Sequence, residues 1–160
     1  MSSATPSSIS ASGNVYTLGI GLSGTPDGSE VLTVVPVDDG IHDGAGNEAS
    51  TTQSNNTATL NDKAVPIIST VALASNNATI AVTFNEAVYN TNGGSGSLEA
   101  NDFSFSIIGG TATLSSATPS SISASGNVYT LGIGLSGTSS GSEVLTVVPV
   151  SYTHLRAHET

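Results

Sequence analysis

The 160-residue sequence predicts an all-β protein built from antiparallel β-sandwich repeats, and three observations support this fold class. No stretch of ten residues has the i, i+3, i+4, i+7 spacing of apolar side chains that an amphipathic helix needs. Short segments with strand character are instead separated by turn residues, which is typical of sandwiches. Ser2–Val37 recurs as Ser115–Val150, with only Pro26-Asp27 changed to Ser139-Ser140, so the period is 115 − 2 = 113 residues, the size of one domain.

Four segments in the first part of the chain have the alternation or the β-branched composition of strands: Ser8–Ser12, Val15–Leu22, Glu30–Val37 and Thr57–Leu60. In the second segment, the large side chains from Tyr16 to Leu22 alternate with small ones and are expected to face a core. Residues 23–29 form a Gly- and Pro-containing turn, so the second and third segments are expected to pair as a hairpin. In the last segment, Ala58 and Leu60 are expected to point inward.

Three more segments precede the second copy and also have strand character: Val65–Leu73, Thr79–Phe84 and Asp102–Ile108. Thr111–Leu114 then leads into the second copy. Asn76-Asn77 is expected to turn the chain between the first two segments, and Leu98–Asp102 is expected to form one helical turn. Alternation predicts that six large side chains of the second and third segments face the core: Ile80, Val82, Phe84, Phe103, Phe105 and Ile107.

The position of the repeated segment predicts that the chain contains parts of two repeats, both truncated. Residues 1–62 correspond to the C-terminal part of one repeat, and residues 63–150 correspond to the N-terminal and central part of the next. Because a linker reaches at most about 3.5 Å per residue, one part is not expected to complete the other across a linker of a few residues. We therefore expect two partial sandwiches whose strands have open edges.

The end of the chain differs in character from the rest. The match between the two copies stops after Val150, and Ser151–Thr160 contains the only arginine and two of the three histidines. This stretch resembles the in-frame translation of a sequencing adapter, so residues 151–160 are expected to be a non-native tail. His154 and His158 are therefore left out of the search for metal ligands.

The charge balance and the residue types exclude several classes of function. Twelve acidic side chains against Lys63 and Arg156 give a formal net charge of −10, which disfavours nucleic acid and anionic lipid as partners. The chain has no cysteine, and its polar residues are mostly Ser, Thr, Asn and Gly, a composition that suits an exported protein. No apolar run is long enough to insert into a membrane, and His42 has no nucleophile or second histidine at a suggestive spacing. We therefore expect an extracellular or cell-surface protein without enzymatic activity.

Two motifs, Val82–Val88 (VTFNEAV) and Gly40–Asn47 (GIHDGAGN), resemble those of the bacterial Ig-like repeat domains in surface-layer and large adhesin proteins. Those families show Phe-Ser-Glu followed by Pro or Ala and then Val, and a late Asp-x-Ala-Gly-Asn loop; here Asn85 replaces the serine. The resemblance covers the 113-residue period in order. It implies Ig-like antiparallel β-sandwich repeats in a long extracellular rod that serves as a cell-surface scaffold or in adhesion. The implied partners are neighbouring repeats and a cell-surface glycan or protein.

The loop from Asp38 to Asn47 is dense in carboxylates and glycines and is a candidate calcium site. Asp38, Asp39, Asp43 and Asn47 offer the hard oxygen ligands that calcium prefers, although their spacing is not that of an EF-hand loop. In the alternative interpretation, the glycines serve a tight turn and the aspartates accept hydrogen bonds from its backbone amides.

A related hypothesis places a calcium ion at the joint between two repeats. If the strands are counted from Val65–Leu73, Glu86 follows the second strand and the Asp38 loop follows the sixth, so both are expected at the same pole of a sandwich. Asp62 of the preceding repeat would arrive at that pole, and a bridging cation would stiffen the joint. The aspartate loop and Glu86 lie in different partial repeats of this chain, so neither part is expected to hold the whole site.

A different class of function is a carbohydrate-binding or accessory module of a secreted hydrolase. Such a module needs exposed aromatic side chains on a flat sheet face, but the chain has no tryptophan, and Tyr16 and Tyr129 are expected in the core. Glu86, Glu99 and Asp102 are the carboxylates to consider for a glycosidase. Their positions beside strand ends favour a structural role.

Overall fold

The computed structural model describes residues 3–150, and the chain divides into two compact units between Val65 and Pro66. Unit 1 denotes residues 3–65 and unit 2 denotes residues 66–150. The division lies slightly later than the one expected after residue 62. Residues 151–160, for which the sequence predicts a non-native tail, lie outside the described residues.

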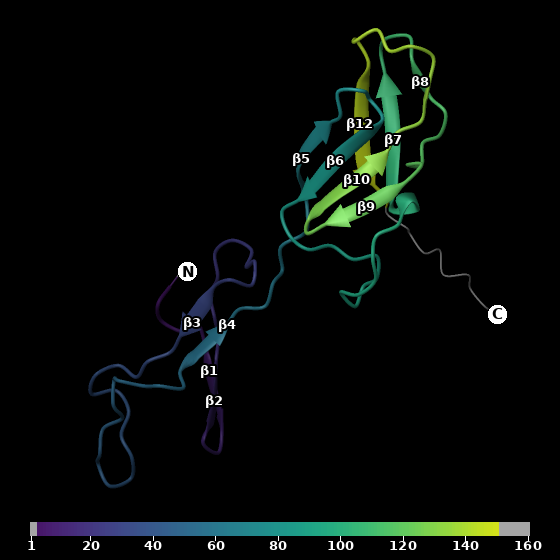
Figure 1. The fold of residues 1–160 in the computed structure, drawn as a ribbon. Coiled ribbons are helices and arrows are strands. Elements are labelled where there is room, and N and C mark those ends of the chain that lie inside the picture. The colour runs from purple at the N-terminus through teal and green to yellow at the C-terminus, as the bar shows by residue number, and fades with distance from the viewer. Residues whose placement is uncertain (1–2, 151–160) are drawn as a thin grey trace, which may run out of the picture. The chain divides into compact units, whose positions relative to one another are not determined.

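Short strands make up the regular structure of both units (Figure 1). Unit 1 contains β1 (Ile9–Ser12), β2 (Val15–Leu18), β3 (Val31–Thr33) and β4 (Thr57–Thr59). Unit 2 contains β5 (Ile68–Leu73), β6 (Thr79–Phe84), the 3₁₀ turn η1 (Ala100–Asp102), β7 (Phe103–Ile108), β8 (Thr113–Leu114), β9 (Ile122–Ser125), β10 (Val128–Gly132), β11 (Leu135–Ser136) and β12 (Val144–Pro149). No α-helix occurs among residues 3–150, so the prediction of an all-β fold is confirmed. The helical turn predicted at Leu98–Asp102 corresponds to η1.

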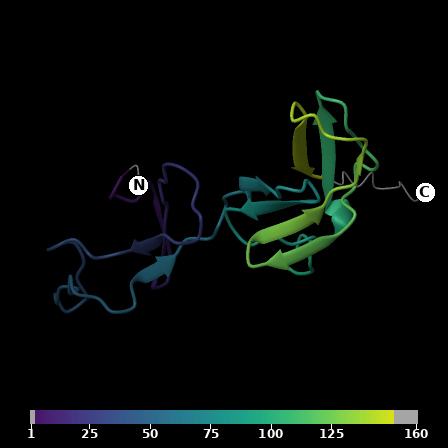
Figure 2. The ribbon, with the colours of Figure 1, turned by 45° about the horizontal axis from the view of Figure 1, so that its top comes forward.

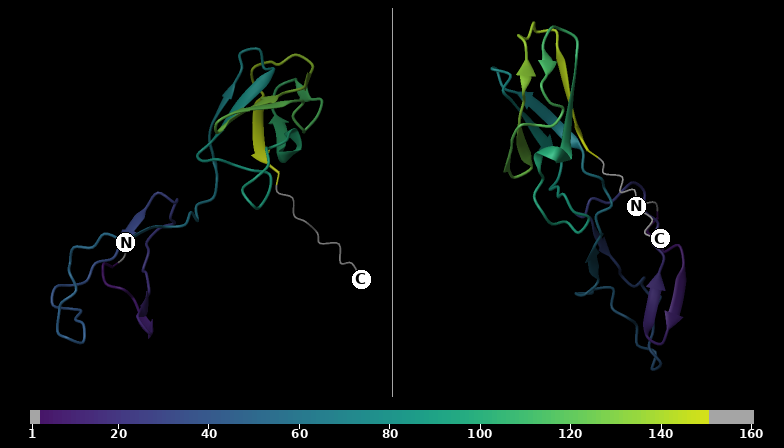
Figure 3. Two further views of the ribbon diagram at one scale, coloured as in Figure 1. Left: turned by 60° about the horizontal axis from the view of Figure 1, so that its bottom comes forward. Right: turned by 90° about the vertical axis from the view of Figure 1, so that its right-hand side faces the viewer.

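Unit 2 contains a sandwich-like arrangement of antiparallel sheets. β5, β6, β10 and β9 form a four-stranded sheet, β12 pairs with β7, and β11 pairs with β8. Figure 2 and Figure 3 show the β7–β12 pair lying across from the four-stranded sheet. The hydrophobic core between them consists of buried side chains from β6, β7 and β10: Ile80, Val82, Phe84, Phe103, Phe105, Tyr129 and Leu131.

Three aromatic rings join the two sheets of unit 2 at the centre of this core. The ring centroid of Phe84 lies 6.2 Å from that of Phe103, and it meets Tyr129 edge-on at 5.9 Å. Phe103 and Tyr129 are 6.2 Å apart, within the range in which aromatic pairs attract one another. Alternate side chains of β6 and the first half of β7 are buried, as the sequence alternation predicts.

Unit 1 contains the same repeated strands but differs in the burial of their side chains. β1 pairs with β2, and β3 pairs with β4. Tyr16 is 62% exposed and Ala58 is also exposed, so the prediction that these residues face a core is wrong. The reason is that all the core side chains identified in the described residues belong to unit 2, so no second sheet covers β2 and β4 within residues 3–65.

The predicted hairpin between Val15–Leu22 and Glu30–Val37 does not form. β2 ends at Leu18 and pairs with β1, whereas β3 pairs with β4. In unit 2, β10 and β12 belong to different sheets, so the turn between the two segments carries the chain from one sheet to the other. Gly19 follows β2 directly, and a Cβ there would lie 2.4 Å from the Ser8 Oγ, so a larger residue would require the Ser8 side chain to move.

The first hairpin of the repeated segment has the same backbone pairing in both copies. β1 pairs with β2 from Ile9↔Leu18 to Ser12↔Val15. β9 pairs with β10 in the same register at positions 113 residues later. The local strand pairing therefore follows from the repeated segment itself, whereas the burial of its side chains depends on the neighbouring strands.

Candidate functional site

The Asp38–Asn47 loop of unit 1 contains a tight turn centred on Asp43. The Asp43 N–H donates to the Asn47 carbonyl oxygen (2.9 Å), and the Gly46 N–H donates to the Asp43 carbonyl oxygen (3.1 Å). The Asp43 Oδ1 accepts from the backbone N–H groups of Ala45 (2.9 Å) and Asn47 (2.8 Å), and its Oδ2 accepts from the Asn47 side-chain amide (2.8 Å). Both carboxylate oxygens thus stabilise the turn, as in the alternative interpretation of this loop.

The electrostatics of Asp43 agree with this role. The side-chain amide of Asn47, followed by the Asn47 backbone N–H, lowers the pKa of the Asp43 carboxyl below its ordinary value. Asp39, with a left-handed φ of 58°, donates its N–H to the Glu48 carboxylate. The Asp39 Oδ1 lies 3.4 Å from the His42 Nε2. A cation bound at this loop would compete with these donors for the oxygen atoms.

The other predicted calcium ligands lie elsewhere in the two units. The Asp62 Oδ1 accepts from the Ala64 N–H (2.8 Å), and Glu86 follows β6 of unit 2, where it is half-buried. Among residues 3–150, no group of three or more His, Cys, Asp or Glu side chains is placed to hold a metal ion. The structure therefore brings Asp43 and Asn47 together but does not assemble the predicted ligands Asp38, Asp39, Asp43, Asn47, Asp62 and Glu86 into one cluster.

Two of the carboxylates considered for a glycosidase organise the start of β7. Glu99 is the N-cap of η1, and its backbone N–H donates to the Asp102 Oδ2 (2.7 Å). The Glu99 side chain in turn accepts from the backbone of Asp102, which completes a capping box. Glu99 and Asp102 thus fix the chain direction just before Phe103 enters the core.

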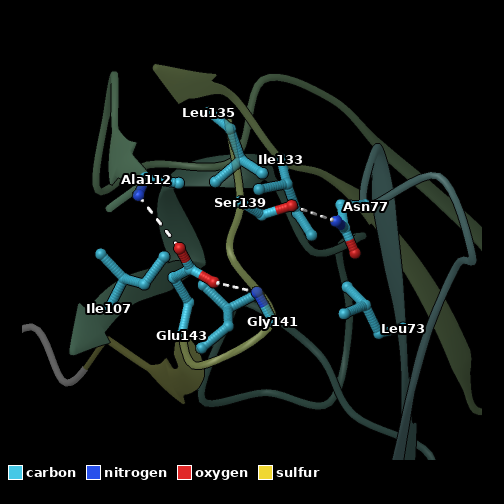
Figure 4. A pocket seen from close by; sticks show the side chains of 10 residues that line it. Leu73, Asn77, Ile107, Ala112, Ile133, Leu135, Ser139, Gly141 and Glu143 are labelled. Atoms are coloured by element: carbon cyan, nitrogen blue, oxygen red, sulfur yellow. Dashed lines mark hydrogen bonds between the residues drawn. The ribbon is translucent and has the colours of Figure 1, made fainter. Parts of the chain in front are cut away.

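Unit 2 contains a cavity of about 210 Å³ at one end of its core (Figure 4). Apolar side chains line most of it, and Asn77 closes one side by donating from its side-chain amide to the Ser139 hydroxyl (3.1 Å). Glu143 lines another side. The volume is below the range of about 300–1,000 Å³ that is typical of pockets for drug-sized ligands.

The carboxylate of Glu143 is the most strongly hydrogen-bonded acidic group of this region (Figure 4). Its Oε1 accepts from the N–H groups of Thr111 (2.9 Å), Ala112 (3.0 Å) and Ser140 (2.9 Å), and its Oε2 accepts from the N–H of Gly141 (2.9 Å). The N–H groups of Ser140, Ala112 and Thr111, in that order, hold the pKa of the Glu143 carboxyl far below its ordinary value. Glu143 therefore ties the segment before β8 to the turn before β12.

The sequence interpretation did not single out Glu143. The available signal was its position directly after the Gly141-Ser142 turn pair, where a carboxylate can accept from backbone amides. The remaining donors to the Glu143 carboxylate are the backbone N–H groups of Thr111 and Ala112, which lie more than 30 positions earlier in the sequence. Only the tertiary structure brings these residues to Glu143.

We expect Glu143→Gln to destabilise unit 2 in a pH-dependent manner. Because the folded-state pKa of Glu143 is lowered, its charge stabilises the folded state above the ordinary glutamate pKa of about 4.3. This contribution falls as the pH drops below that value towards the lower folded-state pKa. Urea unfolding should therefore show a lower midpoint for Glu143→Gln at pH 6, and the difference from the unchanged chain should shrink at pH 3.

The repeated segment supplies the matched control, Glu30→Gln. Glu30 occupies the equivalent position, where its carboxylate accepts from the Asp27 N–H (3.2 and 3.3 Å). The corresponding cavity of unit 1, about 190 Å³, is lined by residues of the same turn and by Leu60. We expect a smaller change for Glu30→Gln, and equal changes for the two variants would contradict the assigned role of Glu143.

No family model, curated protein or solved structure matches the chain. Among the described residues, 3–150, there is no helix whose length and apolar character would let it cross a membrane. Proposals about function therefore rest on the repeated segment, the sheet topology and the chemistry of the loops.

Proposed function

We propose that the chain is part of a tandem Ig-like repeat that acts as a non-enzymatic spacer and adhesion module of a bacterial cell-surface protein. The observation that carries the proposal is the repeated segment Ser2–Val37/Ser115–Val150, whose two copies pair their first two strands in one register. Repetition at a domain-sized period suits a protein whose task is to span distance, because each added period lengthens the array. The resemblance of Val82–Val88 and Gly40–Asn47 to bacterial Ig-like domains supports the same function.

The composition supports an extracellular location for such an array. The chain lacks cysteine and has a formal net charge of −10, so repulsion between neighbouring repeats favours an extended array. The proposed partners are the adjacent repeats and, at the end of the array, a cell-surface glycan or protein.

The spacer function predicts that the length of an array grows in proportion to its number of periods. Chains with one to four copies of the 113-residue period can be compared by small-angle X-ray scattering. We expect the maximum dimension to rise by a nearly constant increment for each period. Growth with the cube root of the mass, as for a compact globule, would contradict the spacer function.

Adhesion is tested separately with the same arrays on immobilised polysaccharides and on intact bacterial cells. Retention on cells with no retention on polysaccharide supports a protein ligand at the surface. Retention that free sugar reverses would instead favour the carbohydrate-binding or accessory module of a secreted hydrolase.

Calcium stiffening stays a prediction and has its own test. Asp62 of one repeat would have to meet, around one cation, Glu86 of the following repeat and the residues equivalent to Asp38 and Asp39 in that same following repeat. If calcium binds, a concentration about 100-fold above its Kd should stabilise a two-repeat array by about 2.7 kcal/mol, which raises its melting temperature by about 10 °C. Asp39→Asn is the matched variant, because asparagine also tolerates the left-handed φ of 58° at this position. An identical melting temperature in calcium and in chelator would rule the prediction out.

A further inference from the structure

The β1–β2 pair of unit 1 and the β9–β10 pair of unit 2 have identical sequences in different surroundings. Tyr129 is 8% exposed and Leu131 is 0% exposed, whereas Tyr16 is 62% exposed and Leu18 is half-buried. Since the sequence and the register are the same, the difference comes from the strands that cover β10. The apolar face of β2 is therefore exposed in unit 1, while the equivalent face of β10 is covered in unit 2.

Strand β6 covers β10 by pairing with the edge that points away from β9. Tyr129 lies opposite Val82, and Leu131 lies opposite Ile80. Strand β2 uses the edge equivalent to the β9 side for its pairing with β1. The unpaired edge of β2 is therefore equivalent to the edge of β10 that pairs with β6.

The backbone groups along this edge of β2 can be assigned from unit 2. The Ile133 N–H donates to the Ala78 carbonyl oxygen at the end of the β6–β10 ladder (2.9 Å). Because hydrogen-bonding direction alternates along a strand, the N–H groups of every second residue before Ile133 also face β6. The equivalent residues of β2 are Tyr16 and Leu18, so their N–H groups face the edge that has no paired strand within unit 1.

The second repeated strand shows the same complementarity. In unit 1, the Val34 N–H donates to the Asn56 carbonyl oxygen on the β4 side (2.8 Å). In unit 2, the Val150 N–H donates to the Asp102 carbonyl oxygen on the β7 side (2.7 Å). Val34 corresponds to Val147, which lies three residues before Val150 (150 − 147 = 3). Because the direction of the N–H groups alternates along a strand, two residues an odd number apart point their N–H groups to opposite edges. The β3–β4 and β12–β7 ladders therefore use opposite edges of equivalent strands. The edge of β3 that is equivalent to the β7-paired edge of β12 stays unpaired within unit 1.

We propose that unit 1 is a docking surface for a second β5–β8 segment, a polypeptide with the sequence of residues 66–114. Its β6 strand pairs with β2 and its β7 strand pairs with β3, in the registers that unit 2 shows, while the β1–β2 and β3–β4 pairs stay in place. Its apolar side chains cover Tyr16 and Leu18 as they cover Tyr129 and Leu131. The proposal commits to this occupant because the same surface is covered by this sequence in unit 2, and it holds whether or not the protein is an adhesin.

The test uses the full chain with an additional copy of residues 66–114 in place of Met1, so that the added Leu114 precedes Ser2 as the resident Leu114 precedes Ser115. Ser12→Ala, at an exposed position, is present in every sample so that peptides from the two hairpins differ in mass. Hydrogen exchange at Val15–Leu18 is expected to slow by at least about 100-fold and to approach that of Val128–Leu131. Unchanged exchange at Val15–Leu18 overturns the proposal.

The matched control carries Val82→Asp in the added copy only. Val82 is 0% exposed in unit 2, so a carboxylate at this position in the added segment prevents it from covering Tyr16. We expect fast exchange at Val15–Leu18 in this control, with Val128–Leu131 still protected by the resident segment. Protection of Val15–Leu18 that survives Val82→Asp would show unspecific collapse and would overturn the proposal. Protection gained at one hairpin and lost at the other would show mere exchange of the resident segment, and it would overturn the proposal as well.

Discussion

Leu131→Ala is expected to lower the free energy of unfolding of unit 2 by about 3 kcal/mol. Leu131 is 0% exposed within the core formed by β6, β7 and β10, so truncation removes buried apolar surface and leaves a cavity. Urea unfolding monitored by circular dichroism measures the change as a shift of the midpoint at an unchanged slope.

The chain contains its own control for this substitution, because Leu18 occupies the equivalent position in an identical segment. Leu18 is half-buried in unit 1, so Leu18→Ala is expected to cost about 1 kcal/mol or less. The local sequence of the two leucines is the same, so the difference between the variants measures the effect of the covering strands alone. Equal losses for Leu18→Ala and Leu131→Ala would show that the two hairpins are packed alike, in contradiction to the structure.

Phe103→Ala is expected to have the largest effect of any single substitution in the core, about 4 kcal/mol. Phe103 is 1% exposed, and its ring lies 6.2 Å from those of both Phe84 and Tyr129. Its loss opens a cavity between the two sheets and removes two aromatic contacts. Small domains have a total stability of about 5–15 kcal/mol, so the melting temperature of unit 2 should fall strongly.

Ser106→Ala is the control for Phe103→Ala on the same strand. Ser106 is exposed on β7, and its substitution is expected to change the free energy of unfolding by about 0.5 kcal/mol or less. A change for Phe103→Ala as small as that for Ser106→Ala would contradict the packing of β7 against the four-stranded sheet.

The strands could be predicted from the sequence because their alternation is local. Thr79–Phe84 was predicted with its exact bounds, and Phe103–Ile108 within one residue. The pairing of β2 could not be predicted, since the turn after Leu22 is compatible with either a hairpin or a connection between sheets. Tyr16 was wrongly placed in a core because alternation identifies the apolar face of a strand but does not reveal whether another sheet covers it.

The candidate sites show a similar division between local and tertiary information. The turn-stabilising interpretation of Asp43 could be predicted, because its partners Ala45 and Asn47 are close in sequence. The role of Glu143 could not, because Thr111 and Ala112 reach it only through the packing of the β7–β8 connection against the turn before β12. Whether Asp62 and Glu86 come together depends on how adjacent repeats are placed, which the local sequence does not determine.

The opposite edges used by β3 and β12 determine where a single module of this protein should be cut for expression. A polypeptide that starts near Pro66 and runs for one whole period would carry each strand type once, with the β12 strand between β7 and a β4 strand. A boundary placed inside the repeated segment would instead separate strands that belong to one ladder and leave apolar faces in water. The phase of the cut, more than the length of the fragment, should therefore decide whether a recombinant module is monodisperse.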